Sequence, residues 1–495
     1  MALEVGIKHL RDGIEPQFTS GAIMDVLGVI GPAEGADADM FPLNKVVYLK
    51  SNERLKVAAL GSQGTLAQAI RGMSAQLNGS ARAAKVVVVR TAEGANVQET
   101  IANLVGSEAN GTGIWAFLDA PEDLGVTPRL IIAPGYTSQT VRGLINPEIT
   151  AAGTGGTNGT FALSFTGGTG TGGEGTFTVT AGALTNVTIT NPGSYTVKPT
   201  LAFTASTGLT GASASVDLEQ VSNGVCAAIP AVTGRLKAKF LPEGPTNSRQ
   251  DWLDWLETLP TSADILHPLR QDAKVYDEDG ELITVPLSPY IVALYARRDS
   301  ERDGVPSGSI CNQPVYGLVG VSPKIHLSLT DETSQGQEDL AAGAGIVAKG
   351  EAGVEDAPGS SGFSFWGYDT MSDQTEWRFA HVNRMRDYIE LGQIKANRMY
   401  LGRFNITLQT IEAIMNTIRM DLARLAADQH ILSPFKVDFE PQYNSAGELR
   451  DGEIDISFAV EEPPVLRKLI LRSRRHLPAL DALVQTISVQ LGAAA

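Results

Sequence analysis

An abrupt change in composition divides this chain and limits the folds that it can adopt. From about residue 147 to residue 222, Gly and Thr dominate, and only Glu174 and Lys198 are charged between positions 150 and 216. Short alternating Thr/Val runs separated by Gly-rich turns are typical of a small all-β module. A flexible Gly/Thr linker is the alternative, but linkers lack a set of core-forming aromatic residues such as Phe161, Phe165, Phe177, Tyr195 and Phe203. We therefore predict an all-β insertion over residues 147–222.

The segments on both sides of this insertion mix strand-like and helix-like patterns. Residues 85–89 and 129–133 are apolar runs that indicate buried strands, whereas residues 65–77 have apolar side chains at helical spacing. A helical stretch at residues 247–259 follows the insertion. The whole pattern is typical of the α/β class. We predict one discontinuous α/β domain, formed by residues 21–146 and 223–350, in a multidomain chain.

The last third of the sequence predicts an α+β domain over residues 351–475. Asn405 is placed to cap a helix whose apolar residues recur at spacings of three and four up to Leu425. Two alternating runs on either side of a turn at residues 444–452 then predict an antiparallel hairpin. Its inward-facing residues are Phe435, Val437, Phe439, Ile454, Ile456 and Phe458.

Both ends of the chain alternate apolar and polar residues without an obvious hairpin partner nearby. At the N-terminus, within residues 1–20, these residues are Leu3, Val5 and Ile7. At the C-terminus, within residues 476–495, they are Ile487, Val489 and Leu491. We predict an arm with a short strand at each end of the chain.

Length and charge exclude several classes of protein. A chain of 495 residues exceeds what one core usually serves, and it suggests about three domains. The formal net charge of −16 argues against a general nucleic-acid binder, because phosphate affinity needs an excess of cations. No stretch approaches the roughly 18 to 20 apolar residues of a membrane helix, and residues 1–20 lack the apolar core of a signal peptide. We expect a soluble protein made in a cytoplasm.

Motifs for catalysis, cofactor binding or metal binding have no support in the sequence. The turn at residues 61–64 lacks the lysine of a phosphate loop, and residues 277–280 favour a hairpin turn over a calcium loop. The six histidines are scattered, and Cys226 and Cys311 are expected to be simple buried thiols. We expect no catalytic, cofactor-binding or metal site.

Four short segments, in order along the chain, carry a resemblance to a known family. They are Phe41-Pro-Leu-Asn-Lys45, Gly64-Thr-Leu-Ala67, the run from Val126 to Gly135, and Phe365-Trp-Gly367. In this order and spacing the chain resembles the tail sheath proteins of phages with contractile tails, particularly those of P2-like phages. The similarity runs from about residue 21 to residue 488, apart from the Gly/Thr-rich insertion, which departs from the compact form of the family.

This resemblance implies a structural subunit that polymerises as stacked rings around a tail tube and contracts without nucleotide hydrolysis. Its implied partners are further copies of itself, the tube protein, and the baseplate and tail terminator proteins. It implies a place in the virion tail, assembled in the cytoplasm of the host bacterium. We expect the terminal strands to pair with the edges of the hairpin in neighbouring subunits.

The innermost domain in such a sheath is the C-terminal one, and there this acidic chain has basic residues. Lys395, Arg398 and Arg403 are candidates to face acidic groups on the tube, although a solvated helix face is the plain alternative. Two other functions stay open. One is the sheath of a related, pyocin-like injection device, and the other is a carbohydrate-binding or adhesive protein with exposed aromatic residues on the insertion.

Overall fold

The computed structural model describes residues 21–77, 82–206, 208–350 and 362–492. Its contacts divide the chain into two units, one that ends at Pro463 and one that begins at Pro464. The predicted N-terminal strand with Leu3, Val5 and Ile7 lies outside the described residues.

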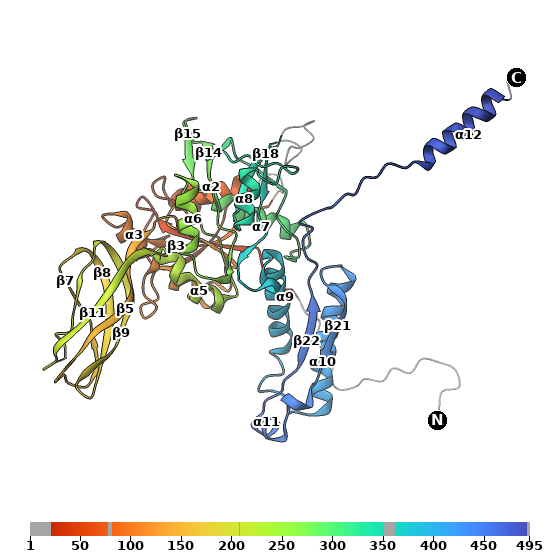
Figure 1. The fold of residues 1–495 in the computed structure, drawn as a ribbon. Helices are drawn as coiled ribbons and strands as arrows, with labels where there is room; N and C mark the ends of the chain where they lie inside the picture. Colours follow the sequence, from red (N-terminus) through yellow and green to blue (C-terminus); the bar gives the residue numbers. More distant parts are fainter. Residues whose placement is uncertain (1–20, 78–81, 207, 351–361, 493–495) are drawn as a thin grey trace, which may run out of the picture. The chain divides into compact units, whose positions relative to one another are not determined.

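A seven-stranded mixed sheet forms the centre of the first unit (Figure 1). Five strands are parallel in the order β3 (Lys85–Thr91), β1 (Val26–Pro32), β4 (Leu130–Ile132), β12 (Lys239–Phe240) and β13 (Ser262–Leu266). The edge strands β2 (Val46–Lys50) and β20 (Thr370–Met371) are antiparallel to their neighbours. The runs predicted as strands at residues 85–89 and 129–133 are β3 and β4, and the mixed α/β class is confirmed.

Helices cover both faces of this sheet, which explains why the central residues of β1, β3 and β4 are mostly apolar. Leu27 and Val29 of β1 face a cluster that includes α2 (Leu66–Leu77) and α7 (Ser288–Ser300). Val26 and Ile30 of the same strand face a second cluster on the opposite side. That cluster includes α3 (Val97–Val105), the 3-10 helix η2 (Gly113–Asp119), α5 (Gly224–Leu236) and α6 (Arg249–Glu257). Two short helices, α1 (Arg54–Ala59) and α4 (Ala120–Leu124), complete the region before β4.

The insertion between β4 and α5 consists of strands, as predicted, so the linker alternative is wrong. It begins a few residues earlier than expected, where β5 (Val141–Thr154) pairs with β11 (Thr210–Val221) in an antiparallel ribbon. The other strands are β6 (Gly159–Ala162), β8 (Thr169–Thr180) and β9 (Ala183–Val197) in one sheet, and the pair β7 (Ser164–Thr166) and β10 (Thr200–Ala202). Phe177, Tyr195 and Phe203 are buried in a core that this module does not share with the central sheet.

Two small sheets follow the sixth helix. The predicted hairpin at Asp279-Gly280 is confirmed, since β14 (Asp272–Tyr276) pairs with β15 (Leu282–Val285) and with β17 (Gly320–Ser322). The second sheet contains β16 (Gln313–Val315), β19 (Gly362–Trp366) and β18 (Ile346–Gly350). The short helix α8 (Gln335–Ala341) lies between β17 and β18.

Two long helices and a hairpin end the first unit (Figure 1). After the 3-10 turn η3 (Thr375–Trp377) come α9 (Ala380–Asn397) and α10 (Leu408–Ala427). The cap of α10 is Thr407, whose hydroxyl accepts from the Thr410 N–H, so the prediction of Asn405 is wrong by two residues. Between β21 (Leu432–Asp438) and β22 (Ser457–Glu461) lie η4 (Pro441–Tyr443) and α11 (Ala446–Asp451), where a turn was expected.

The second unit consists of a stretch without helix or strand at residues 464–477, followed by α12 (Pro478–Gly492). The predicted strand at Ile487, Val489 and Leu491 is therefore wrong. Leu480, Leu483, Val484, Ile487 and Leu491 recur at helical spacing, and this period describes the segment better than simple alternation.

Candidate assembly interfaces

The alternation of apolar and polar residues predicts an antiparallel hairpin near the C-terminus, and β21 and β22 form one. Val437 lies opposite Phe458, and Lys436 lies opposite Ala459. Phe435, Val437 and Phe458 lie within the two strands, whereas Phe439, Ile454 and Ile456 lie just outside them. The inward side chains of the hairpin pack on Met385 of α9 and Leu422 of α10. One face of the hairpin is thus buried within the subunit.

The two outer edges of this hairpin are candidate sites for pairing with another strand. In the described part of the chain, β21 and β22 pair with each other and with no third strand. Each strand therefore has one edge that no described strand occupies, although Arg419 donates to the Val437 carbonyl and Arg386 donates to the Val460 carbonyl. Such an edge is a template for pairing with a strand from another chain.

The second unit exposes the side chains that could meet such an edge. Every described residue from Leu466 to Gly492 is exposed, including the apolar face of α12. The stretch before α12 contains five cations, Arg467, Lys468, Arg472, Arg474 and Arg475. An exposed apolar and cationic segment of this length is uncommon on a monomer and indicates a surface that a partner covers.

The three residues predicted to face a tube lie at the end of α9 and in the turn that follows. Lys395, Arg398 and Arg403 are exposed, and none of them pairs with an acidic side chain among the described residues. Ile394, Leu401 and Leu408 are exposed beside them. These cations thus lie at one end of α9 and in the turn that follows, a region in which several apolar side chains are exposed as well.

Three other basic residues of the same region are already bound within the subunit. Arg378 donates to Asp369, Arg384 to Asp299, and Arg386 to Glu462. Arg384 is fully buried. These three side chains are occupied by partners inside the subunit, a distinction that the sequence did not reveal.

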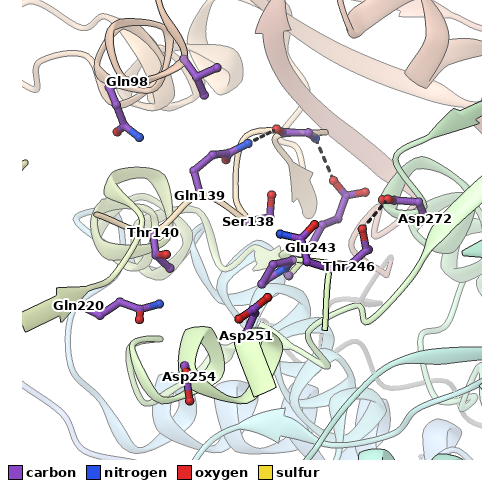
Figure 2. Close-up of a pocket in the computed structure, with 15 residues that line it drawn as sticks. Gln98, Ser138, Gln139, Thr140, Gln220, Glu243, Thr246, Asp251, Asp254 and Asp272 are labelled. Atoms are coloured by element: carbon purple, nitrogen blue, oxygen red, sulfur yellow. Dashed lines mark hydrogen bonds between the residues drawn. The ribbon is translucent and has the colours of Figure 1, made fainter. Parts of the chain in front are cut away.

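A polar cavity of about 690 Å³ lies at the carboxyl ends of β4 and β12 (Figure 2). The Glu243 carboxylate closes one side of it, where it accepts hydrogen bonds from the backbone N–H groups of Gly135 (2.9 Å) and Ser288 (2.7 Å). Burial raises the pKa of Glu243 to about 7. Asp272 accepts from Thr246 at 3.1 Å, and burial raises the pKa of Asp272 as well. Sequence reasoning missed Glu243, which no motif marks.

The lining of this cavity is rich in carboxylate, amide and hydroxyl groups and contains no Lys, Arg, His or Cys. Within the described ranges, no three His, Cys, Asp or Glu side chains are placed to hold a metal ion. Glu243 instead connects the loops after β4 and β12 with the start of α7, which is a structural role.

None of the helices in the described part of the chain combines the length and apolarity needed to cross a membrane. Cys226 is buried and Cys311 is partly buried, and neither forms a disulfide. Burial raises the pKa of the Cys226 thiol above its usual range, which makes it unreactive.

Curated sequences similar to this chain are phage sheath proteins. The chain is 32% identical over 145 residues to the tail sheath protein of Escherichia phage P2, a match that covers 28% of this chain and 35% of the relative. It is 30% identical over 118 residues to the major tail sheath protein of Serratia phage KSP20, covering 23% and 30%. The matches thus span about a third of the length of these relatives. No protein-family model matches the chain.

Solved structures extend the likeness to nearly the whole chain. The helical sheath of the anti-feeding prophage in the contracted state aligns with a TM-score of 0.58 and 15% identity, covering 96% of this chain and all of that chain. A sheath complex of the extracellular contractile injection system PVC, also contracted, aligns with a TM-score of 0.57 and 11% identity, covering 97% and 99%. This chain has the contractile-sheath fold. The resemblance to tail sheath proteins is confirmed, and in this sheath fold the β module is inserted between β4 and α5.

Proposed function

We propose that this chain is the structural subunit of a contractile phage tail sheath. In this role it polymerises as stacked rings around the tail tube and contracts by subunit rearrangement, driving the tube through the host envelope. The observation that carries the proposal is the alignment with contracted sheath chains over 96% or more of this chain. Its partners are then other copies of the chain, the tube protein, and the baseplate and tail terminator proteins. Its location is the virion tail, after assembly in the bacterial cytoplasm.

The proposed domains have largely separate cores, but at their borders Phe365 and Ala380 belong to the α/β core and Leu144 belongs to the core of the insertion. The discontinuous α/β domain comprises residues 21–146 and 223–350, and the insertion of residues 147–222 has its own apolar cluster. Residues 351–475 form the inner, tube-facing domain, whose core contains Met385, Leu422 and Val437. Residues 1–20 and 476–495 are the arms, and residues 464–475, which belong to the second unit, lead from Pro463 into the C-terminal arm.

The lattice is held together by exchange of main-chain segments between subunits. The edges of the hairpin are the acceptors, and the N-terminal donor contains Leu3, Val5 and Ile7. Because residues 478–492 are helical, the stretch at residues 464–477 is the better C-terminal donor, since its backbone N–H and C=O groups are not used by a helix. In this scheme Ile487 and Leu491 pack against a neighbour as part of a helix face, and Val489 has no strand role.

The exposed end of α9 is the proposed contact with the tube. Among the described residues, Lys395, Arg398 and Arg403 have no acidic partner and lie near exposed apolar residues, a combination that suits a partly acidic partner. Exposed ion pairs contribute only about 0.2 to 1 kcal/mol each, so they can break during contraction while many copies together still hold the tube. Contraction then uses free energy stored during assembly, and we assign the chain no enzymatic activity.

A related injection device is the second candidate, because the anti-feeding prophage and PVC are the structural neighbours. Genes for a capsid and a terminase beside this gene would favour the phage tail. The adhesive alternative loses its main support, because none of the five aromatic residues of the insertion is exposed. Phe177, Tyr195 and Phe203 are buried, and Phe161 and Phe165 are partly buried.

Negative-stain electron microscopy tests the proposal. The full chain is purified alone and after coexpression with its tube protein. Hollow cylinders or tube-filled rods are the expected result. A stable monomer under both conditions would refute the proposed function.

A further inference from the structure

Helix α9 contacts the chain where its first described residues enter the body. The Arg384 guanidinium donates from Nη2 to the Met24 carbonyl at 3.3 Å, just before β1 begins. Gly21 packs against Tyr388 so closely that a Cβ atom at Gly21 would lie 2.0 Å from the Tyr388 hydroxyl oxygen. The root of the N-terminal arm is thus held by two side chains of α9.

The same helix holds the place where the C-terminal arm leaves. Arg386 donates from Nε and Nη2 to the two carboxylate oxygens of Glu462, at 2.8 and 3.0 Å, and from Nη2 to the Val460 carbonyl at 3.1 Å. Glu462 is only 4% exposed. His381 donates from Nε2 to the Pro463 carbonyl at 3.0 Å. Burial lowers the pKa of His381, which keeps the ring neutral at neutral pH. Pro463 is also the last residue of the first unit.

Buried ion pairs fix α9 itself to the central sheet and to α7. Arg384 and Asp299 form two hydrogen bonds, and both side chains are buried. Asp387 lies 2.8 Å from the Lys239 ammonium group of β12, which also contacts Asp264 of β13 at 2.7 Å. Through these contacts, α9 joins both arm roots to the largest core of the subunit.

We propose that residues 381–388 of α9 form a clamp that fixes the departure points of both arms. His381 and Arg386 hold the C-terminal root, and Arg384 and Tyr388 hold the N-terminal root. The inference rests on the proposed function, in which the arms carry load between subunits during contraction. The clamp transmits that load to the central sheet, and it prevents the residues at both arm roots from detaching from the first unit. Arg386 and Glu462 are positioning residues, since they contact neither the tube nor a neighbour's strand in this scheme.

The Arg386–Glu462 pair offers the sharpest test, because it can be broken without disturbing the buried Arg384–Asp299 pair. Three variants of the full chain form a double-mutant cycle: R386A, E462Q and the double variant. The control is R235A, which removes the exposed pair between Arg235 and Glu108 far from α9 in the sequence. Two quantities are measured. The first is the rate of backbone amide hydrogen exchange at residues 459–466, and the second is the fraction of the chain that pellets after coexpression with the tube protein.

We expect amide exchange at residues 459–466 to accelerate about ten- to a hundredfold in both single variants, as for loss of a charged hydrogen bond. We expect no further increase in the double variant. Far-UV circular dichroism stays unchanged, and the pelleted fraction falls several-fold. R235A behaves as the wild type. Unchanged exchange at residues 459–466 in R386A and E462Q would overturn the clamp. If wild type also fails to pellet, the proposed function fails, while hydrogen exchange still decides whether the clamp exists.

Discussion

Arg384 and Asp299 form a fully buried bidentate ion pair, with Nη1–Oδ1 and Nη2–Oδ2 distances of 3.0 and 2.6 Å. The Arg384 guanidinium also lies 4.7 Å from the centre of the Tyr295 ring. This pair joins α9 to α7 across 85 residues of sequence. Its burial means that neither charge has water as an alternative partner.

Removing one member of this pair leaves an uncompensated buried charge. We expect R384A and D299A each to lower the free energy of unfolding by about 3 to 5 kcal/mol. The double variant R384M/D299L restores much of that loss, because no buried charge remains. Urea unfolding of the monomer measures these values. R235A, at an exposed pair, serves as the control and costs about 0 to 1 kcal/mol. A loss in R384A no larger than in R235A would contradict the buried-pair account.

Glu243 predicts a specific dependence of stability on pH. Burial raises its folded pKa from 4.5 to about 7, so the folded state binds this proton more tightly than the unfolded state. Its contribution to stability is therefore fully present below pH 4.5 and is lost as the pH rises through about 7. The variant E243Q should lack this slope between pH 5 and 7.5, relative to wild type, while losing some stability overall because its amide nitrogen cannot accept a hydrogen bond.

The matched control for this series is E174Q, on the insertion, at an exposed carboxylate. Urea unfolding at several pH values gives the slopes. We expect E174Q to keep the wild-type slope. If E243Q also keeps the wild-type slope, the buried Glu243 carboxylate is not the source of the pH dependence.

The insertion should be removable without loss of the α/β unit. Val141 pairs with Val221 and Arg142 with Gln220, so the chain enters and leaves the module on adjacent antiparallel strands. Replacing residues 143–219 by Asn-Gly closes the ribbon with a two-residue turn. We expect a soluble protein that keeps helical circular dichroism and unfolds cooperatively. An unfolded or aggregated product would show that the module supports the central core.

Charge reversal at the end of α9 tests the proposed tube contact. K395E/R398E is expected to reduce cosedimentation with the tube protein several-fold at low salt, because two attractive charges become repulsive. The control K45E/K324E reverses two exposed lysines elsewhere in the α/β region. Equal cosedimentation of both double variants would leave the solvated-face alternative as the explanation.

The sequence predicts those helices and strands whose order of apolar and polar residues reflects which of their faces are buried. The Val run of β3 is apolar because helices cover both faces of the sheet, and the hairpin alternates because only one face is buried. The helix α12 was misread as a strand because Leu483, Ile487 and Leu491 satisfy both periods. A fully exposed segment has no core that selects between them.

The occupied basic residues could not be separated from the free ones by sequence. Arg384, Arg386 and Lys395 look equivalent along one helix, yet the acidic partners of the first two are distant in sequence, at Asp299 and Glu462. Glu243 could not be found from the sequence for the same reason, because one of its hydrogen-bond donors, the Ser288 N–H, is distant in sequence. Local pattern carries no information about such long-range partners.

Cryo-electron microscopy of the polymer formed with the tube protein tests the central claim most directly. The account predicts that β21 and β22 gain at least one further strand from a neighbouring subunit. It also predicts that residues 464–477 supply one of these strands while Glu462 stays bound to Arg386. A polymer in which the hairpin remains two-stranded, with the arms packed elsewhere, would contradict the account.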